Sequence, residues 1–345
     1  MKQYAICGIG TLFLALCCMI PAGALEVSAH SAILMDADTG AVLYEKAADQ
    51  RALIASTTKI MTAMVVLEQD NLYLDETVEI PREAAGIEGS SMYLKAGETV
   101  TVRALLYGMM LSSGNDAAAA LALHTFGSIE AFAARMNEKA RALGLRDTHF
   151  ANPNGLDSEE NYSTARELGK IAMAALDTPG FREIVSARSY TAGNRQLVNH
   201  NKLLWQYPGA IGVKTGFTKR AGRILVGAAE QNGRTLISVT ISDPEDWRDH
   251  RAMLDYGFGL YQQRQVVAPG QVLGLLTVME QGGWHREEVL AGEAVTLYLR
   301  EDESPEIRMY LPMFRYGPLE HGEPLGTGEV YVDGVKMAET AGFCP

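Results

Sequence analysis

Hydrophobic and polar positions alternate with two different periods along this chain. Residues 31–46 hold two short apolar runs separated by Asp38-Thr39-Gly40, which predicts two strands joined by a turn. Residues 56–69 carry an apolar stripe at helical spacing. Residues 187–242 hold several short apolar runs and predict further strands. The turn sequences in this last segment are Gly193-Asn194, Pro208-Gly209 and Asn232-Gly233.

The middle of the chain has the pattern of packed helices. Residues 101–111 predict one helix, which the sequence SSGN interrupts. Residues 116–126 are apolar on nearly every side, so this helix should be buried. Residues 128–145 form an amphipathic pattern that ends near Gly144. Thr164 and Glu167 form a capping-box sequence that opens another helix, and residues 245–261 read as a terminal amphipathic helix.

The order of these elements predicts an α+β fold. We expect the early strands to pair with the late ones in a single antiparallel sheet, with the helices packed on it. After residue 262 the pattern changes to short alternating runs separated by Gly, Pro and acidic residues, which indicates a small all-β domain. The predicted divisions are therefore residues 1–24, 25–261 and 262–345.

Residues 1–24 are typical of a secretory signal peptide. Lys2 precedes an apolar segment, and Ala22-Gly23-Ala24 supplies the small residues of a cleavage site. The alternative is an uncleaved anchor helix. With either interpretation the protein works outside the cytoplasm, as an exported, periplasmic, secreted or envelope protein.

Composition excludes several classes of function. The 345 residues carry a net charge of −12, so the chain is not a nucleic-acid binder by default, and it lacks a basic patch for anionic lipid. Three of the four cysteines fall within residues 1–24, which leaves Cys344 and no disulfide framework. The seven histidines form no His-x-x-x-His pair. We therefore expect no metal and no cofactor.

Three short motifs offer chemistry. Ser56-Thr57-Thr58-Lys59 places a hydroxyl and an amine three residues apart, on one face of a helix. This pair is either a nucleophile with its base, or a helix N-cap with a solvated lysine. Ser113-Gly114-Asn115 lies between two helices and by itself is better explained as a turn. Lys214-Thr215-Gly216 lies among the strands and by itself is better explained as a strand end with a solvated lysine.

The three motifs together, in this order, resemble those of the serine-type D-alanyl-D-alanine carboxypeptidases, the low-molecular-mass penicillin-binding proteins. Flanking sequences resemble the family as well; they are LMDADTGAVLYEKAAD, SSGNDAA, NPNGL, NHNKLL and GVKTGFTKRAGRILV. The resemblance covers residues 28–261 and extends loosely into the tail. It implies a β-lactamase/transpeptidase-like domain that removes the terminal D-alanine from peptidoglycan stem pentapeptides through a Ser56 acyl-enzyme and is acylated by β-lactams.

The same resemblance assigns the catalytic roles. Ser56 is the nucleophile, and Lys59 is its base if its amine is neutral, which burial and a nearby cation favour. Lys214 is that cation. Ser113 can relay a proton to the departing D-alanine. Asn115 can donate to the substrate's amide carbonyl or hold Lys59 in place.

The remaining assignments concern substrate binding. Lys214 attracts the free carboxylate of the peptide, and Thr215 donates a hydrogen bond to it. Gly216 allows the backbone to approach the substrate closely. The backbone N–H groups of Ser56 and Phe217 form the oxyanion hole. Arg248 is either a further carboxylate ligand or part of a solvated helix face.

Two other classes of protein fit the sequence less well. A class A β-lactamase needs a glutamate for deacylation, which in that family lies four residues before an asparagine, and no asparagine of this chain has one there. A non-catalytic binding protein on the same fold is disfavoured because Ser56, Lys59 and Lys214 are all present. The C-terminal sequence VKMAETAGFCP is too short and too mixed for a membrane-docking helix, so membrane association is not evident from it.

Overall fold

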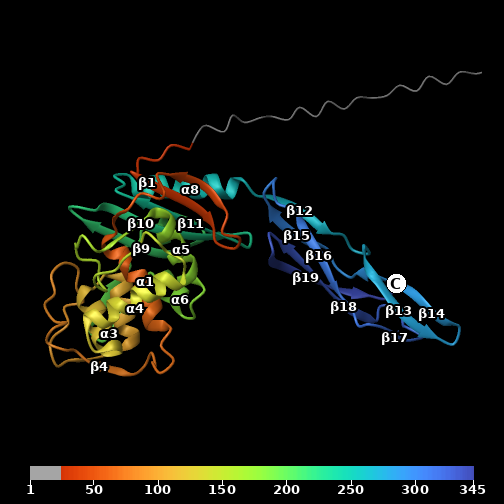
Figure 1. Cartoon of the computed structure of the whole chain (residues 1–345), viewed down its shortest axis with the longest axis horizontal. Coiled ribbons are helices and arrows are strands. Elements are labelled where there is room, and N and C mark those ends of the chain that lie inside the picture. The colour runs from red at the N-terminus through yellow and green to blue at the C-terminus, as the bar shows by residue number, and fades with distance from the viewer. Residues whose placement is uncertain (1–24) are drawn as a thin grey trace, which may run out of the picture.

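The computed structural model describes residues 25–345, so the predicted signal peptide lies outside the described residues. A mixed region of helices and strands is followed by a region of strands (Figure 1). The helices are η1 (Ala55–Thr58, a 3-10 turn), α1 (Lys59–Leu67), α2 (Val102–Leu111), α3 (Asn115–Phe126), α4 (Ile129–Ala142), α5 (Ala165–Leu176), α6 (Phe181–Ser186), α7 (Leu203–Gln206) and α8 (Asp246–Gly259).

The strands of the mixed region are β1 (Ser31–Asp36), β2 (Val42–Lys46), β3 (Ala52–Leu53), β4 (Thr77–Glu79), β5 (Thr99–Thr101), β6 (Tyr162–Ser163), β7 (Ser189–Ala192), β8 (Arg195–Val198), β9 (Ala210–Thr218), β10 (Gly222–Gln231) and β11 (Arg234–Ile241). Five of them form the main antiparallel sheet, in the order β2-β1-β11-β10-β9. The predicted pairing of early with late strands is confirmed, since β1 lies beside β11 with Ser31 opposite Ile241.

Both faces of this sheet are covered. Successive residues of a strand point to opposite faces, and on β1 the side chains of Ile33 and Met35 join one core while those of Ala32 and Leu34 join another. The first core contains α1, α3 and α5, and the second contains residues of α8. Double coverage explains why β1 is apolar almost throughout rather than alternating. Strand β9 forms one edge of the sheet and lies against η1.

Three local predictions need correction. Ser56 is not a helix N-cap: it lies inside η1, α1 begins at Lys59, and no side chain caps that helix. The segment 187–242, expected to be strands, also contains the short helix α7. Thr164 caps α5 by accepting from the Glu167 N–H at 3.1 Å, but the Glu167 carboxylate does not return to residue 164. It accepts instead from the N–H groups of residues 146 and 147.

The predicted helices around SSGN are present. α3 is buried from its first residue through Ala122, as its apolar sequence indicated. In residues 25–345 no single helix is long and apolar enough to cross a membrane. Only α3 and α4 taken together have the length and apolar composition of a span, and the two helices are bent by 86° at the break between them.

The region after α8 consists of strands. They are β12 (Gln262–Val267), β13 (Val272–Glu280), β14 (Gly283–Ala291), β15 (Val295–Leu299), β16 (Pro305–Tyr310), β17 (Arg315–Tyr316), β18 (Pro324–Val332) and β19 (Val335–Phe343). Six of them form one sheet in the order β16-β18-β19-β14-β13-β17, and β12 pairs with β15. Figure 1 shows this region extending away from the end of α8 as an elongated arm.

A buried group of charges joins the arm to the main sheet. Arg234, the first residue of β11, is 2% exposed and lies 2.8 Å from the carboxylate of Glu303 and 3.4 Å from that of Asp36. Arg300 lies 3.2 Å from the other oxygen of Glu303. The Tyr261 hydroxyl donates to Asp36. Since both carboxylates are fully buried, their charges depend on these two arginines.

Substituting Arg234→Met should therefore destabilise the protein strongly. It leaves the Glu303 carboxylate with a single arginine partner and weakens the pairing of Asp36, and removing one partner of a buried ion pair costs about 3–5 kcal/mol in the free energy of unfolding. Urea unfolding measures this. The matched control is Arg308→Met, because Arg308 pairs with Glu306 on the exposed surface and its loss should change the unfolding midpoint little. Equal effects of the two substitutions would contradict this account of the junction.

Candidate active site

The fold brings the three motifs to one cleft between the edge strand β9 and the helices. Ser56 reaches it from η1, Ser113 from the break between α2 and α3, and Thr215, Gly216 and Phe217 from β9. The cleft has a volume of about 280 Å³. The other three predicted residues, Lys59, Asn115 and Lys214, lie buried beside or behind these side chains. All eight predicted site residues thus belong to one site.

Ser56 and Lys59 are directly hydrogen-bonded. The Lys59 Nζ lies 2.9 Å from the Ser56 Oγ, because the 3-10 turn η1 carries the serine directly into the first turn of α1. The amine also donates to Asn115 Oδ1 at 2.8 Å and to the backbone carbonyl of Asn154. Lys59 is completely buried. Three separate segments therefore hold this amine against the serine hydroxyl.

The surroundings of Lys59 favour its neutral form. Burial holds the pKa of Lys59 well below its usual range, and the nearby Lys214 lowers it further, while Asp116 acts in the opposite direction. A neutral amine within hydrogen-bonding distance of a serine hydroxyl can take its proton. This geometry can therefore supply a nucleophile and a general base.

Lys214 is a second buried amine. It is 1% exposed, and its Nζ donates to the carbonyl of Thr215 at 2.9 Å. Burial lowers the pKa of Lys214 to about 7. The site therefore holds two buried amines close together, and burial lowers the pKa of both.

Close backbone contact places β9 against η1. A Cβ atom added at Gly216 would lie 3.3 Å from the backbone nitrogens of both Ser56 and Thr57, so a side chain there would press the backbone that carries Ser56. Gly155, with φ of 84°, packs on the other side of η1; a Cβ there would lie 1.9 Å from the Ala55 carbonyl oxygen. These two glycines allow the turn that carries Ser56 to be enclosed.

Two residues of the site hold left-handed backbone conformations. Ala55, directly before the nucleophile, has φ of 44°, and Ser113 has φ of 61°. Non-glycine residues adopt this region at a cost of about 1–3 kcal/mol, and such residues cluster at active sites. The packing around η1 and the α2–α3 break is what holds both serines in position.

The structure adds cleft residues that the sequence did not single out. Arg223 and Asp246 line one part of the cleft and form an ion pair with N–O distances of 2.8 and 3.0 Å, beside Trp247. His200 and Ser90 also line the cleft. The remaining lining residue is Ile224. Arg223 lies on β10 and Asp246 at the start of α8, so only the folded sheet brings them together and no local pattern could have shown the pair.

Arg248, which the sequence left as either a carboxylate ligand or a solvated residue, does not line the cleft. It is largely exposed and pairs with the neighbouring Asp249 at 2.9 Å. The solvated interpretation therefore holds, and Arg223 is the arginine of the cleft.

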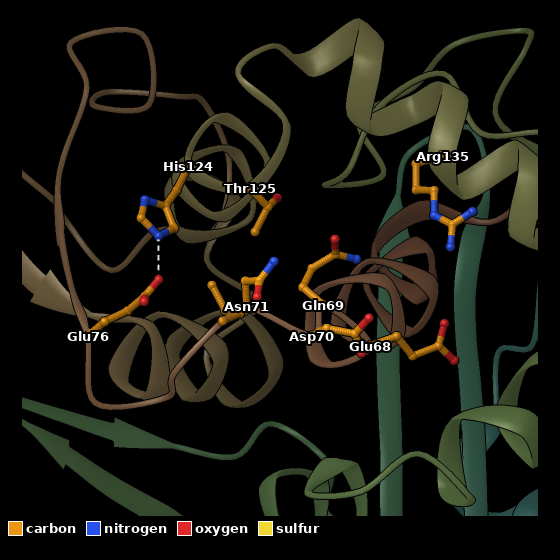
Figure 2. Close-up of a pocket in the computed structure, with 9 residues that line it drawn as sticks. Glu68, Gln69, Asp70, Asn71, Glu76, His124, Thr125 and Arg135 are labelled. Carbon is orange, nitrogen blue, oxygen red and sulfur yellow. Dashed lines mark hydrogen bonds and ion pairs between the residues drawn. The ribbon is translucent and has the colours of Figure 1, made fainter.

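A larger hollow, about 410 Å³, lies away from the motifs (Figure 2). Its polar lining includes the His124 ring, which lies 2.7 Å from the Glu76 carboxylate, as the dashed line in Figure 2 marks. Thr125, beside that histidine in sequence, donates to the Leu121 carbonyl of its own helix at 2.7 Å. This hollow thus offers no hydroxyl paired with a base. In residues 25–345 no group of three or more His, Cys, Asp or Glu side chains is placed to hold a metal ion.

Comparison with known proteins gives the same picture. The peptidase S11 family model, described as D-alanyl-D-alanine carboxypeptidase, matches residues 19–245. The chain belongs to this family. It is therefore a hydrolase, a serine D-alanyl-D-alanine carboxypeptidase, of a family that acts on peptidoglycan peptides ending in D-Ala-D-Ala and binds β-lactams.

Curated relatives and solved structures agree with this placement. The D-alanyl-D-alanine carboxypeptidase DacF of Bacillus subtilis is 33% identical, covering 92% of this chain and 85% of that protein. The D-alanyl-D-alanine carboxypeptidase of a Streptomyces species (strain K15) is 42% identical over 68% of this chain and 88% of that one. The solved structure of penicillin binding protein 5 from Haemophilus influenzae is similar to this fold with a TM-score of 0.68. It is 28% identical in sequence, over 92% of this chain and 97% of that one.

The packing of Gly155 against the nucleophile turn generates a prediction. Gly155→Ala places a methyl group where the Ala55 carbonyl lies, so η1 must shift, and a displacement of about 1 Å at a reacting group can cost roughly a hundredfold in rate. The rate of acylation by benzylpenicillin measures the loss. Gly144→Ala is the matched control, because Gly144 also has a positive φ, 72°, but no atom within 4 Å of an added Cβ. If both variants acylate alike, the contact with η1 does not matter.

Proposed function

We propose that Ser56 is the acylated nucleophile of this carboxypeptidase and that Lys59 is its general base. The observation that carries the proposal is the buried Lys59 amine, 2.9 Å from the Ser56 hydroxyl, with a pKa held well below its usual range. Lys59 takes the hydroxyl proton as the Ser56 Oγ attacks the carbonyl carbon of the penultimate D-alanine. The serine then carries the shortened peptide as an ester.

The leaving group must receive a proton as the peptide bond breaks. The Lys59 ammonium supplies it, and the hydroxyl of Ser113 in the same cleft relays it to the departing amine of D-alanine. Water then attacks the ester carbonyl and gives a proton to Lys59. As the ester bond breaks, Lys59 returns a proton to the Ser56 oxygen and the shortened peptide is released. Asn115 holds the Lys59 amine in line through its Oδ1.

Substrate recognition follows from the other side of the cleft. The Lys214 ammonium attracts the free carboxylate of the peptide, and the Thr215 hydroxyl donates to it. Gly216 admits the peptide backbone, and the N–H groups of Ser56 and Phe217 stabilise the oxyanion. The substrates are peptidoglycan stem pentapeptides, and β-lactams acylate the same serine.

We also propose the cellular setting. Residues 1–24 act as a signal peptide that exports the protein. Outside the cytoplasm the enzyme trims the peptides of the cell wall and thereby contributes to cell shape. The unit of catalysis is residues 25–261, and residues 262–345 form a separate β-rich domain that acts as a spacer or partner surface.

Replacing the nucleophile gives a direct test. Ser56→Ala should abolish both D-alanine release from a D-Ala-D-Ala peptide and the mass increase of one penicillin after brief exposure to benzylpenicillin, because no other hydroxyl of the cleft contacts Lys59. Intact-protein mass spectrometry measures the adduct. Ser90→Ala, which also removes a cleft hydroxyl, is the control and should still be labelled. A labelled Ser56→Ala protein would overturn the assignment.

The Lys214 pKa of about 7 predicts how substrate binding depends on pH. The ammonium is present below this pKa and is lost as pH rises through it, so between about pH 6 and pH 8 its protonated fraction falls roughly tenfold. The KM for a peptide with a free C-terminal carboxylate should rise by up to the same factor. A peptide ending in an amide carries no charge there, and its Ki as a competitive inhibitor should stay constant. A KM that is flat over this range would contradict the role of Lys214.

A further inference from the structure

A buried carboxylate beside the active site has no part in the mechanism above. Asp116 is the second residue of α3 and is completely buried. It follows Asn115, whose side chain accepts a hydrogen bond from Lys59. A fully buried acid is costly unless its environment offsets the cost, so its presence next to the general base needs an explanation.

Both oxygens of Asp116 accept hydrogen bonds. Oδ1 accepts from the N–H groups of Met92 at 2.9 Å and Ala117 at 2.9 Å. Oδ2 accepts from the Ser91 hydroxyl at 2.6 Å and the Leu94 N–H at 3.0 Å. Three of these partners are backbone N–H groups, which can only donate, and the Ser91 hydroxyl can donate as well, so the contacts suit the carboxylate form of Asp116.

The Asp116 carboxylate lies near two positive groups that also act on the Lys59 amine. Lys214 is a buried cation on the far side of the cleft, and the N-terminus of α3, where Asn115 bonds Lys59, carries the positive end of the helix dipole. Burial and Lys214 lower the pKa of Lys59, and Asp116 is the group that raises it. Burial lowers the pKa of His200, which also lines the cleft, and the nearby Lys214 lowers it further.

We propose that Asp116 is the counter-charge of the active site: its carboxylate partly offsets Lys214 and the α3 N-terminus at the Lys59 amine, and thereby fixes the pH above which Lys59 is a competent base. Asp116 is thus a positioning residue that acts through Lys59 and touches no substrate. The inference rests on the proposed roles of Ser56 and Lys59.

The alternative role for Asp116 is mechanical, since its bonds also hold the loop of residues 91–94. That loop has a second, independent attachment. Arg195 donates to the carbonyls of Met92 at 2.8 Å and Tyr93 at 3.1 Å, and it is itself paired with Glu98. The loop therefore keeps an anchor when the charge of Asp116 is removed, and the two roles can be separated.

The test is the pH dependence of the second-order rate of acylation by benzylpenicillin. Asp116→Asn has nearly the same shape without the charge, so Lys59 should become neutral at lower pH. The acidic limb of the profile should shift downward by roughly one pH unit, the size expected for removing an opposite charge close to a buried amine. The measurements are made in wild-type and His200→Gln backgrounds, so that titration of the His200 ring is separated from that of Lys59.

Ser91→Ala is the matched control. It removes one of the same hydrogen bonds and loosens the same loop, but it leaves the charge in place, so its acidic limb should coincide with that of the wild type. If Asp116→Asn and Ser91→Ala give the same limb as the wild type, or shift it equally, Asp116 is mechanical and the inference is wrong.

A second variant keeps the test decisive if Asp116→Asn fails to fold. The double substitution Ser91→Asp with Asp116→Ser moves the carboxylate across the existing 2.6 Å hydrogen bond and keeps the charge in the site. Its limb should lie closer to that of the wild type than the limb of the single substitution Asp116→Ser, and coincident limbs would overturn the inference. Failure of the wild-type protein to be acylated at any pH would instead refute the proposed function, which distinguishes the two.

Discussion

The structure of this enzyme is organised around one requirement, the burial of the Lys59 amine next to the Ser56 hydroxyl. An amine in water is protonated near neutral pH and cannot accept a proton. Burial removes the solvent that would stabilise the ammonium form, and hydrogen bonds hold the amine in place. The Asn115 Oδ1 and the Asn154 carbonyl accept its two N–H groups, which leaves the nitrogen lone pair for the Ser56 hydroxyl 2.9 Å away. The packing of the helices against the sheet brings together the segments that carry these groups.

Enclosing the amine imposes a second constraint, on backbone rather than on side chains. The turn η1 must fit between β9 and the segment that carries Gly155; an added Cβ at Gly216 would press its backbone at 3.3 Å, and one at Gly155 would overlap it. Ala55 accepts a left-handed conformation within this fit. The glycine of the Lys-Thr-Gly motif is thus explained by contact with the nucleophile turn as well as by access for the substrate. The residues that allow η1 to be enclosed therefore lie next to the residues that carry the chemistry.

The sequence was a good guide wherever a signal is local. Apolar periodicity located the strands β1 and β2 and the helices around SSGN, and turn sequences located the β7–β8 and β10–β11 hairpins. The N-cap interpretation of Ser56, one of the two that its motif allowed, is wrong because Ser56 lies inside a 3-10 turn that leads directly into α1. The Arg223–Asp246 pair, the charges joining the arm to the sheet, and the placement of Asp116 beside Lys59 all depend on contacts between distant segments. A residue-by-residue pattern carries no information about such contacts.

The protonation state of Lys59 is the claim on which the account depends most, and it can be measured directly. Labelling the lysine side chains with 15N at the ε-amine and following them by NMR from pH 5 to pH 11, with Lys59→Arg to assign the signal, reports each amine separately. We expect the Lys59 amine to titrate well below the usual range of a lysine side chain, which is near about 10.4. A Lys59 signal that titrates together with the exposed lysines would contradict the account, because a permanently protonated amine cannot activate Ser56.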